Sequence, residues 1–400
     1  MSTPTWVPVP DGSPFPVQNL PYGVFSPAGG PPRCGVAIGE HVLDLSQVRV
    51  PHADSFAAAS LNGFLARGRT AWSEVRATVT DLLTDERHRA AVEPHLHRID
   101  AVTMHLPVEV ADYVDFYSSE HHAMNVGAIF RPDSPALPPN WKHLPIGYHG
   151  RAGTLVVTGT DVVRPSGQRK PPDAAEPVFG PSRRLDIEAE VAFVVGVPSV
   201  LGDVVPASSF RDHVFGLALL NDWSARDIQA WEYQPLGPFL GKSFATSLSA
   251  WIVPLEALEA ARIPLPRQEP SVLPYLTDDD PWTLDLALEV LLNGEAVSRP
   301  PFSTMYWSPG QQLAHLTVNG ASLRTGDVFA SGTVSGPEVG QRGSFLELSW
   351  GGREPLELPS GRAVTFLEDG DEVTITGWAD GADGVRIGLG SVTGRIRPAR

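Results

Sequence analysis

Short apolar runs separated by clusters of glycine and proline characterise the first part of the chain. Runs of about four to eight apolar and β-branched residues between turn-forming residues are typical of β-strands. Three such runs come first: Tyr22–Ser26, Cys34–Ile38 and His41–Leu45. From residue 61 to residue 83 the apolar positions follow mixed helical spacing, with Thr70 and Ala71 between two expected helices. We therefore predict a small N-terminal β-barrel with helical decoration, covering residues 1–107.

Strand-like patterns also prevail in residues 108–400. The stretches that best suit β structure are Thr154–Val157, Asp186–Val195, Leu284–Leu292, Val328–Ala330, Phe345–Ser349 and Glu372–Gly377. One helix is expected at Trp223–Glu232, because Asn221 and Asp222 precede it and Pro235 follows it. The whole pattern predicts a mainly β protein of the α+β class, in which a large mixed-β domain follows the small N-terminal one.

The composition limits which partners the chain can bind and which ligands a metal site could use. The 400 residues include 46 Asp and Glu against 30 Lys and Arg, a formal charge of −16, so no basic surplus is present to bind nucleic acid. Cys34 is the single cysteine, which excludes a disulfide within the chain and a thiolate zinc site. A metal ion would need carboxylate, histidine or carbonyl ligands, which favours Ca²⁺ or Mg²⁺.

The N-terminal sequence MSTPTWVPVPDG has neither the basic segment nor the apolar segment of a signal peptide. No apolar run approaches the ~18 residues needed to span a bilayer. The richest run, Val191–Leu201, is interrupted by Gly196 and Pro198. We therefore expect a cytoplasmic protein that does not associate with membranes.

Glu188 and Glu190 are two residues apart in an apolar stretch, so both side chains leave the same face of a strand. Two adjacent carboxylates repel each other, and a divalent cation would remove that repulsion. A solvated strand face would produce the same alternation of charged and apolar residues. This pattern alone therefore leaves a metal site and a solvent-exposed face as alternatives.

Four polar residues around the expected helix share one face, because they fall at positions i, i+4, i+7 and i+11. They are Asp222, Arg226, Gln229 and Tyr233. Asp222 also suits the role of helix N-cap. An acid, a guanidinium, an amide and a phenol on one stripe fit a substrate pocket, and they equally fit ordinary solvent exposure.

The segment DYVDFYSSEHH places acids, a tyrosine and two histidines within eleven residues. The residues of this segment whose side chains could bind a metal or transfer a proton are Asp112, Asp115, Tyr117, His121 and His122. Histidine titrates nearest neutrality, so the segment could supply a metal ligand and a general base. Each histidine could also be an ordinary surface or structural residue.

A glycine-flanked loop, GPFLGKS from Gly237 to Ser243, is similar to a phosphate-binding loop. It has three residues between its glycines, whereas the nucleotide-binding motif requires four, so nucleotide hydrolysis is not expected. Lys242 remains of interest, because a lysine on such a loop can approach a substrate closely.

Several long stretches resemble the fumarylacetoacetate hydrolase family. They include DYVDFYSSEHHAMNVGAIFR, LPPNWKHLPIGYHGRAGT, NDWSARDIQAWEYQPLGPFLGKSFATS and LRTGDVFASGTVSGPE, and the resemblance extends from near residue 18 to residue 377. It implies an N-terminal SH3-like barrel, a C-terminal mixed β-sandwich roll and a homodimer. It also implies that Ca²⁺ or Mg²⁺ assists the hydrolysis of a small diketo acid, 4-fumarylacetoacetate, to fumarate and acetoacetate, the last step of tyrosine and phenylalanine degradation.

The resemblance also assigns roles to individual residues. The family's calcium ligands fall on Asp115, Glu188, Glu190 and Asp222, and a second ion, similar to magnesium, lies near Asp222, Lys242 and Thr246. The general base falls on His122 and its partner carboxylate on Glu347. The residues that stabilise the leaving carbanion match Arg226, Gln229 and Lys242. Substrate contacts fall on Tyr117, Arg131, Gln229, Tyr233 and Thr333, with Tyr148 nearby.

The chain departs from the family pattern just before the base, where Glu120 and His121 replace a basic residue and a glutamine. Other enzymes of the superfamily are the nearest alternatives: an acylpyruvate hydrolase, an oxaloacetate decarboxylase or a hydratase. A non-catalytic metal-binding β protein is a more distant one, because the base, its partner and the carbanion stabilisers are all present.

Overall fold

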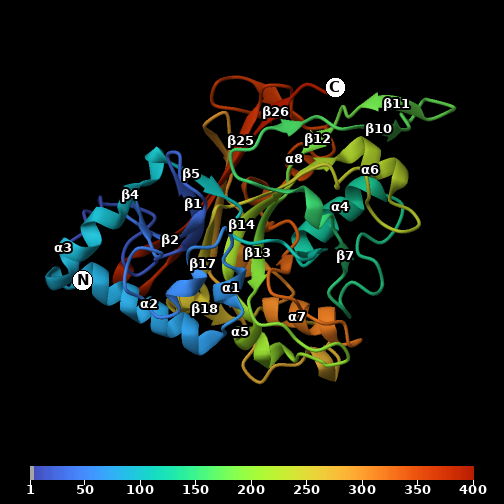
Figure 1. Cartoon of the computed structure of the whole chain (residues 1–400). Coiled ribbons are helices and arrows are strands. Elements are labelled where there is room, and N and C mark those ends of the chain that lie inside the picture. Colours follow the sequence, from blue (N-terminus) through green and yellow to red (C-terminus); the bar gives the residue numbers. More distant parts are fainter. Residues whose placement is uncertain (1–3) are drawn as a thin grey trace.

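The computed structural model describes residues 4–400, and for residue 383 it describes only the backbone. The first three residues of the predicted N-terminal unit, with the start of the segment tested for a signal peptide, lie outside this range. Within it, strands and short helices wrap around a large central sheet (Figure 1). No helix among residues 4–400 is both long enough and apolar enough to cross a membrane.

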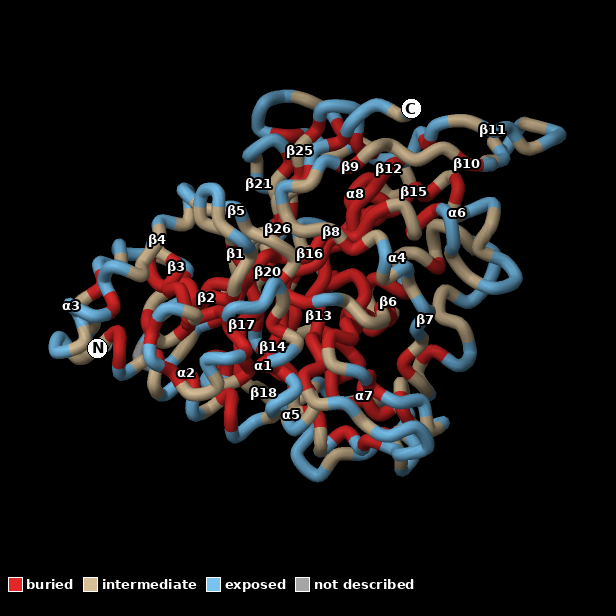
Figure 2. Tube along the Cα trace, viewed as in Figure 1, coloured by how far each residue is buried: buried red, intermediate tan, exposed pale blue. Residues whose placement is uncertain are grey.

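The central sheet has 13 strands and runs in the order β4-β3-β2-β1-β17-β14-β13-β22-β6-β7, with β5, β8 and β16 paired off this path. Its strands are β1 (Tyr22–Pro27), β2 (Arg33–Ile38), β3 (His41–Asp44), β4 (Leu96–Arg98), β5 (Val102–His105), β6 (Tyr113–Phe116), β7 (Gly147–His149), β8 (Leu155–Val157), β13 (Ala189–Val195), β14 (Val214–Asp222), β16 (Thr246–Leu248), β17 (Trp251–Pro254) and β22 (Val328–Ala330). Every residue of β13 and β14 is buried, as expected for near-continuous apolar strands covered on both faces. Figure 2 shows this buried zone in red at the centre of the molecule.

A second sheet of five strands packs against β14 through β25 and β26. Its strands are β9 (Val162–Val163), β20 (Leu286–Leu292), β21 (Glu295–Ser298), β25 (Glu372–Asp380) and β26 (Arg386–Arg397). In β25, Val373 and Ile375 are buried and alternate with half-buried threonines, so one face of this sheet joins the core. The two sheets thus enclose the main apolar cluster of the protein.

Four two-stranded ribbons complete the β structure: β10 (Ser166–Arg169) with β11 (Val178–Pro181), β12 (Leu185–Asp186) with β15 (Ser224–Ala225), β18 (Arg262–Pro264) with β19 (Trp282–Leu284), and β23 (Leu356–Glu357) with β24 (Ala363–Val364). The α-helices are α1 (Asn62–Leu65), α2 (Arg69–Thr84), α3 (Arg89–Val92), α4 (Glu120–Phe130), α5 (Phe210–His213), α6 (Arg226–Glu232), α7 (Pro309–Thr317) and α8 (Phe345–Leu348). The mainly β class predicted from the sequence is confirmed.

The N-terminal strands join the central sheet directly. Strand β1 pairs with β17 through Tyr22 and Ile252 and through Gly23 and Trp251. The predicted N-terminal barrel is wrong in one respect: among the described residues the strands do not close into a barrel, because β4 and β5 are not paired with each other. The first β unit and the rest of the chain therefore share one continuous hydrogen-bonded sheet.

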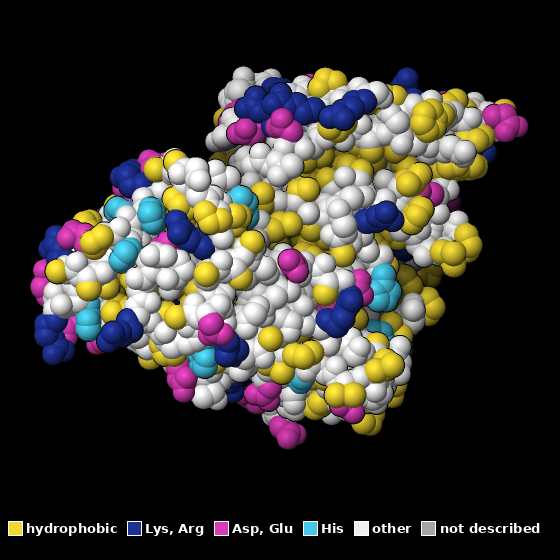
Figure 3. All heavy atoms as spheres, viewed as in Figure 1, with side chains coloured by type: hydrophobic (Ala, Val, Ile, Leu, Met, Phe, Trp, Pro, Cys, Tyr) yellow, Lys and Arg dark blue, Asp and Glu magenta, His cyan; other side chains and the backbone are white. Residues whose placement is uncertain are grey.

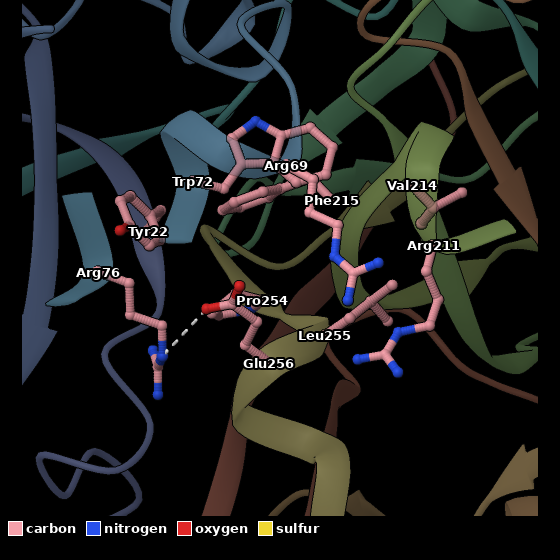
Figure 4. A pocket seen from close by; sticks show the side chains of 10 residues that line it. All are labelled: Tyr22, Arg69, Trp72, Arg76, Arg211, Val214, Phe215, Pro254, Leu255 and Glu256. Atoms are coloured by element: carbon pink, nitrogen blue, oxygen red, sulfur yellow. Dashed lines mark ion pairs between the residues drawn. The ribbon is translucent and has the colours of Figure 1, made fainter. Parts of the chain in front are cut away.

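Helix α2 packs across this junction (Figure 4). The ring of Trp72 meets that of Phe215 edge-on, with centroids 5.2 Å apart, and Arg76 lies 3.8 Å from Glu256. The cavity between these side chains measures about 20 Å³, room for about one water molecule. The junction is thus a packed interface.

Three sequence-based predictions are wrong in their boundaries or type. The break between the first two helices lies at residues 66–68, just before the Thr70–Ala71 position predicted for it. The helix expected at Trp223–Glu232 begins only at Arg226, because β15 first pairs with β12. The stretch expected as a strand at Phe345–Ser349 forms helix α8.

Asp222 is therefore the last residue of β14 and not a helix N-cap. Ala225 occupies the N-cap position of α6 and makes no side-chain capping hydrogen bond. Asp222 was predicted to share one helical face with three later residues. It lies outside the helix, so only the residues from Arg226 onward can share that face.

We expect Gly332→Ala to destabilise the fold strongly. Gly332 has φ +76°, and a Cβ atom there would lie 2.1 Å from the carbonyl oxygen of Phe116. A left-handed residue alone costs about 1–2 kcal/mol with a side chain, and the clash adds to this cost. Gly361→Ala is the matched control, because Gly361 has φ +83° with nothing within 4 Å of its Cβ position. Equal losses of thermal stability in the two variants would contradict this expectation.

Candidate active site

Four buried carboxylates meet at one edge of the central sheet. Asp115 lies near the end of β6, Glu188 immediately precedes β13, Glu190 lies on β13, and Asp222 ends β14. Antiparallel pairing of β13 with β14 brings the start of one strand to the end of the other. One ligand atom from each carboxylate lies within 4.8 Å of the others, and the four residues are at most 5% exposed.

The burial of Glu188 and Glu190 rules out a solvated strand face, the alternative that their spacing allowed. Their apolar neighbours Ile187, Ala189 and Val191 are buried in the main core, on the opposite face. The two-residue spacing therefore separates a carboxylate cluster from the apolar interior.

Several oxygen atoms of the cluster have no hydrogen-bond partner among the described residues. They are both carboxylate oxygens of Glu190 and Oδ1 of Asp115. Burial, followed by repulsion from the neighbouring carboxylates, raises the pKa of both side chains well above the usual value. Unpartnered buried carboxylates are costly, and oxygen atoms so arranged fit a hard divalent cation. The cluster could thus hold a metal ion.

Two cations pair with carboxylates of the cluster. Lys242 Nζ lies 2.5 Å from Glu188 Oε2 and 2.7 Å from Asp222 Oδ2. Arg226 Nη1 donates to Glu188 Oε1 at 2.7 Å, and its Nε donates to Asp186 Oδ2 at 2.8 Å. Burial opposes ionisation of Glu188, but these cations hold its pKa below the usual value.

A histidine–glutamate pair lies beside the cluster. Helix α4 begins with Ser119 as N-cap, which fixes the first turn that carries His122. His122 Nδ1 lies 2.7 Å from Glu347 Oε2, and both side chains are buried. Burial alone would raise the pKa of Glu347, but the contact with His122 and hydrogen bonds from further donors lower it below the usual value. An ionised carboxylate only accepts, so Nδ1 donates and Nε2 is left as an acceptor, 4.0 Å from Glu188 Oε1.

A cavity of about 400 Å³ opens in front of the pair and the cluster. The predicted site residues that line it are Asp115, Tyr117, His122, Arg131, Tyr148, Glu188, Arg226, Gln229, Tyr233, Lys242 and Thr333. Thr333 Oγ1 and Arg226 Nη2 have no hydrogen-bond partner among the described residues. Two polar groups of this cavity wall are thus available to a ligand.

The remaining predicted site residues lie around this cavity. Glu347 and Glu190 are fully buried, as the partner of His122 and as a cluster member. Asp222 and Thr246 line an adjoining cavity of about 120 Å³, where Thr246 Oγ1 donates to Asp222 Oδ1 at 2.9 Å. His121, the neighbour that departs from the family pattern, is absent from the lining of both cavities.

Two supporting residues were missed from the sequence. Asp186 is fully buried and accepts hydrogen bonds from Arg226 Nε and from two backbone N–H groups at the start of α8. Its spacing of two residues before Glu188 was a usable signal. Asn125, three residues after His122, donates to Glu347 Oε1 at 3.0 Å. These residues hold the base partner and the guanidinium in place.

A mainly β fold with a buried carboxylate cluster that could hold a metal ion, beside an oriented imidazole, is typical of one class of protein, the enzymes that combine a metal ion with a general base. Two family models cover the chain: fumarylacetoacetase N-terminal over residues 18–107, and fumarylacetoacetate (FAA) hydrolase C-terminal over residues 112–397. The chain belongs to the fumarylacetoacetate hydrolase family.

Relatives agree with this assignment, and solved structures share the fold. The chain is 49% identical to the fumarylacetoacetase of Homo sapiens and 50% identical to that of Caenorhabditis elegans, over 99% of each chain. Its fold is similar to fumarylacetoacetate hydrolase from Exiguobacterium antarcticum, with TM-score 0.57, 17% identity, and 95% and 100% of the two chains covered. Maleylpyruvate hydrolase from Sphingobium is similar with TM-score 0.53, 16% identity and the same coverage.

Proposed function

We propose that the chain hydrolyses a carbon–carbon bond of 4-fumarylacetoacetate and releases fumarate and acetoacetate. The observation that carries this proposal is the near-50% identity to fumarylacetoacetases over 99% of both chains. The geometry supports it, because the carboxylate cluster and the His122–Glu347 pair border one cavity. Hydrolysis of such a bond needs a base for water and stabilisation of a carbanion.

Ca²⁺ or Mg²⁺ is the proposed cofactor, and Asp115, Glu188, Glu190 and Asp222 are the residues that would hold it. When bound, such an ion would polarise a carbonyl of the 1,3-dicarbonyl substrate. A second ion would lie near Asp222 and Thr246 in the adjoining cavity. Lys242 could offer such an ion only its carbonyl oxygen, because its ammonium group has no lone pair.

His122 is the proposed general base. Its Nδ1 donates to Glu347, so its Nε2 can take a proton from a water molecule in the cavity. The resulting hydroxide adds to the substrate carbonyl. Glu347 keeps the ring in this orientation and stabilises the positive charge that the ring gains.

Arg226, Gln229 and Lys242 are the proposed stabilisers of the leaving carbanion. All three border the cavity, and Arg226 Nη1 also donates to Gln229 Oε1 at 3.1 Å. Collapse of the adduct breaks the carbon–carbon bond, releases fumarate and leaves negative charge on an enolate oxygen. Donors that are fixed before the reaction stabilise that charge at little further cost. The enolate carbon then takes the proton that His122 accepted from water, which gives acetoacetate and restores the base.

Arg131 is the proposed anchor of a substrate carboxylate, since a guanidinium binds a carboxylate through two parallel hydrogen bonds. The other proposed contacts are Tyr117, Tyr148, Gln229, Tyr233 and Thr333, all of which line the cavity. Tyr148 also donates to Asp222 Oδ2 at 3.1 Å, which connects the substrate cavity to the cluster.

The purified protein should consume fumarylacetoacetate, which is measured as loss of substrate absorbance. EDTA should abolish this turnover, and added Ca²⁺ or Mg²⁺ should restore it. Release of CO₂ from oxaloacetate, without release of fumarate from fumarylacetoacetate, would instead identify another activity of the superfamily. Turnover that is indifferent to both chelator and metal would contradict the metal proposal.

We also propose a homodimer in the cytoplasm. Several large apolar side chains are exposed around the β10–β11 hairpin and the loop after α6, among them Phe179, Leu236 and Phe239. Hydrophobic atoms are visible on this side of the molecule in Figure 3. A single buried cysteine suits a reducing compartment. Light scattering on the purified protein would measure the subunit number.

A further inference from the structure

The loop that follows helix α6 leads directly to Lys242. It comprises residues 233–241, and Lys242 is the next residue. Within one chain the apolar side chains of this loop bury little surface, since Leu236 is 95% exposed, Phe239 62% and Leu240 49%. A segment with so few buried contacts opens easily unless hydrogen bonds hold it. The position of Lys242 therefore depends on the hydrogen bonds of the loop.

Glu232, the last residue of α6, binds this loop through its side chain. Its Oε1 atom accepts a hydrogen bond from the backbone N–H of Phe239 at 2.9 Å and another from that of Gly241 at 2.7 Å. Hydrogen bonds from backbone N–H groups to a carboxylate are stronger than those to a neutral acceptor. One half-buried side chain thus connects the end of the helix to the far end of the loop.

The two loop residues that Glu232 binds also fix the backbone of Lys242. Lys242 N donates to the carbonyl oxygen of Phe239 at 3.1 Å. The carbonyl oxygen of Gly241 accepts from the N–H of Ala225, the N-cap residue of α6, at 2.8 Å. A displacement of Phe239 or Gly241 would therefore displace Lys242 as well.

Gly241 also packs directly against α6. A Cβ atom on Gly241 would lie 2.9 Å from the Cβ and from the backbone N of Gln229, so the loop and the helix are in close contact. From the next residue, Lys242 Nζ reaches Glu188 Oε2 at 2.5 Å and Asp222 Oδ2 at 2.7 Å. The contact of the loop with α6 therefore determines where the ammonium group lies.

We propose that Glu232 is a positioning residue, which keeps Lys242 aligned with the other two carbanion stabilisers. This inference rests on the proposed function, in which Arg226, Gln229 and Lys242 stabilise the leaving carbanion. Arg226 and Gln229 lie on α6 itself, whereas Lys242 follows the loop. Donors stabilise a developing charge best when their positions are set beforehand. Glu232 sets the position of the one stabiliser that the helix does not carry.

Glu232→Ala should lower kcat by about 10–100-fold, because a misplacement of about 1 Å can cost about 10²-fold. Glu232→Gln should lose less, since it keeps an acceptor oxygen at the same reach. Glu295→Ala is the matched control: Glu295 is also half-buried and accepts a backbone hydrogen bond, from Ser360 N at 2.8 Å, but it borders neither cavity. A loss in Glu295→Ala or in Glu232→Gln as large as that in Glu232→Ala would overturn the inference.

A double-mutant cycle tests whether Glu232 acts through Lys242. Lys242→Met alone should lower kcat by about 10²–10³-fold, the usual effect of removing one oxyanion donor. In that background Glu232→Ala should change kcat by less than about twofold, because the group that it positions is absent. The same fold loss from Glu232→Ala in both backgrounds would overturn the inference.

Hydrogen exchange provides a measurement that needs neither turnover nor the Lys242→Met variant. The backbone N–H groups of Phe239 and Gly241 should exchange at least about tenfold faster in Glu232→Ala than in the wild type, and at the wild-type rate in Glu295→Ala. Unchanged exchange in Glu232→Ala would overturn the inference. Wild-type protein that does not turn over fumarylacetoacetate would instead contradict the proposed function, and the exchange rates would still test the contact of Glu232 with the loop.

Discussion

Replacing His122 by alanine is expected to lower kcat by about 10²–10⁴-fold, the usual contribution of a positioned general base. His122 is the histidine whose Nε2 is free to accept a proton beside the cluster, because Nδ1 is bound to Glu347. The measurement is the initial rate of fumarylacetoacetate consumption at saturating substrate, together with a thermal unfolding curve that reports the fold.

His121→Ala is the control for that experiment, since His121 is adjacent in sequence but borders neither cavity. It should retain a rate close to that of the wild type. Comparable losses in the two variants, or a full rate in His122→Ala, would mean that the base is a different group.

Glu190→Gln is expected to weaken divalent-ion binding at least as much as the roughly 10–100-fold typical of losing an outer-shell partner. Both oxygens of Glu190 lack partners among the described residues, and its carboxylate lies with three others. Isothermal titration with Ca²⁺ would measure the affinity. Activity should fall in parallel unless the ion is supplied in excess.

The ion-free form of Glu190→Gln should melt at the same temperature as the ion-free wild type or higher, because the amide, unlike the carboxyl group, cannot ionise within a set of carboxylates that repel one another. Saturating Ca²⁺ should raise the melting temperature of the wild type far more than that of the variant, since a bound ligand stabilises the folded state. Asp112→Asn, outside the cluster, should behave like the wild type. An equal rise in all three proteins would exclude Glu190 as a ligand.

Local sequence patterns correctly predicted those strands that are specified by their own residues and by the turns around them. The runs at β1, β2 and β3 are bounded by turn residues and were predicted to within two residues. Helix α8 was missed because FLELSW alternates apolar and polar residues at strand spacing. The overlooked signal was Ser344, whose side chain caps the helix by accepting a hydrogen bond from Glu347 N.

The candidate site was predictable in part for the same reason. The spacing of Glu188 and Glu190 gave their common face, but what lies on that face includes Asp115 and Lys242, which are distant in sequence. The roles of Asp186 and Asn125 were not predicted, because each acts through a residue more than 30 positions away. Tertiary contacts of this kind leave little trace in local patterns.

The pairing of β1 with β17 has a consequence for any attempt to express the region of residues 112–397 alone. Cutting the chain near residue 107 would remove β1, the strand that pairs with β17. The amide and carbonyl groups on that edge of β17 would then lack partners and face solvent, together with Trp251 and Ile252. Exposed edge strands of this type pair with strands of other molecules and form intermolecular sheets. The N-terminal segment therefore acts as a built-in protector against aggregation, in addition to any part it has in forming the fold.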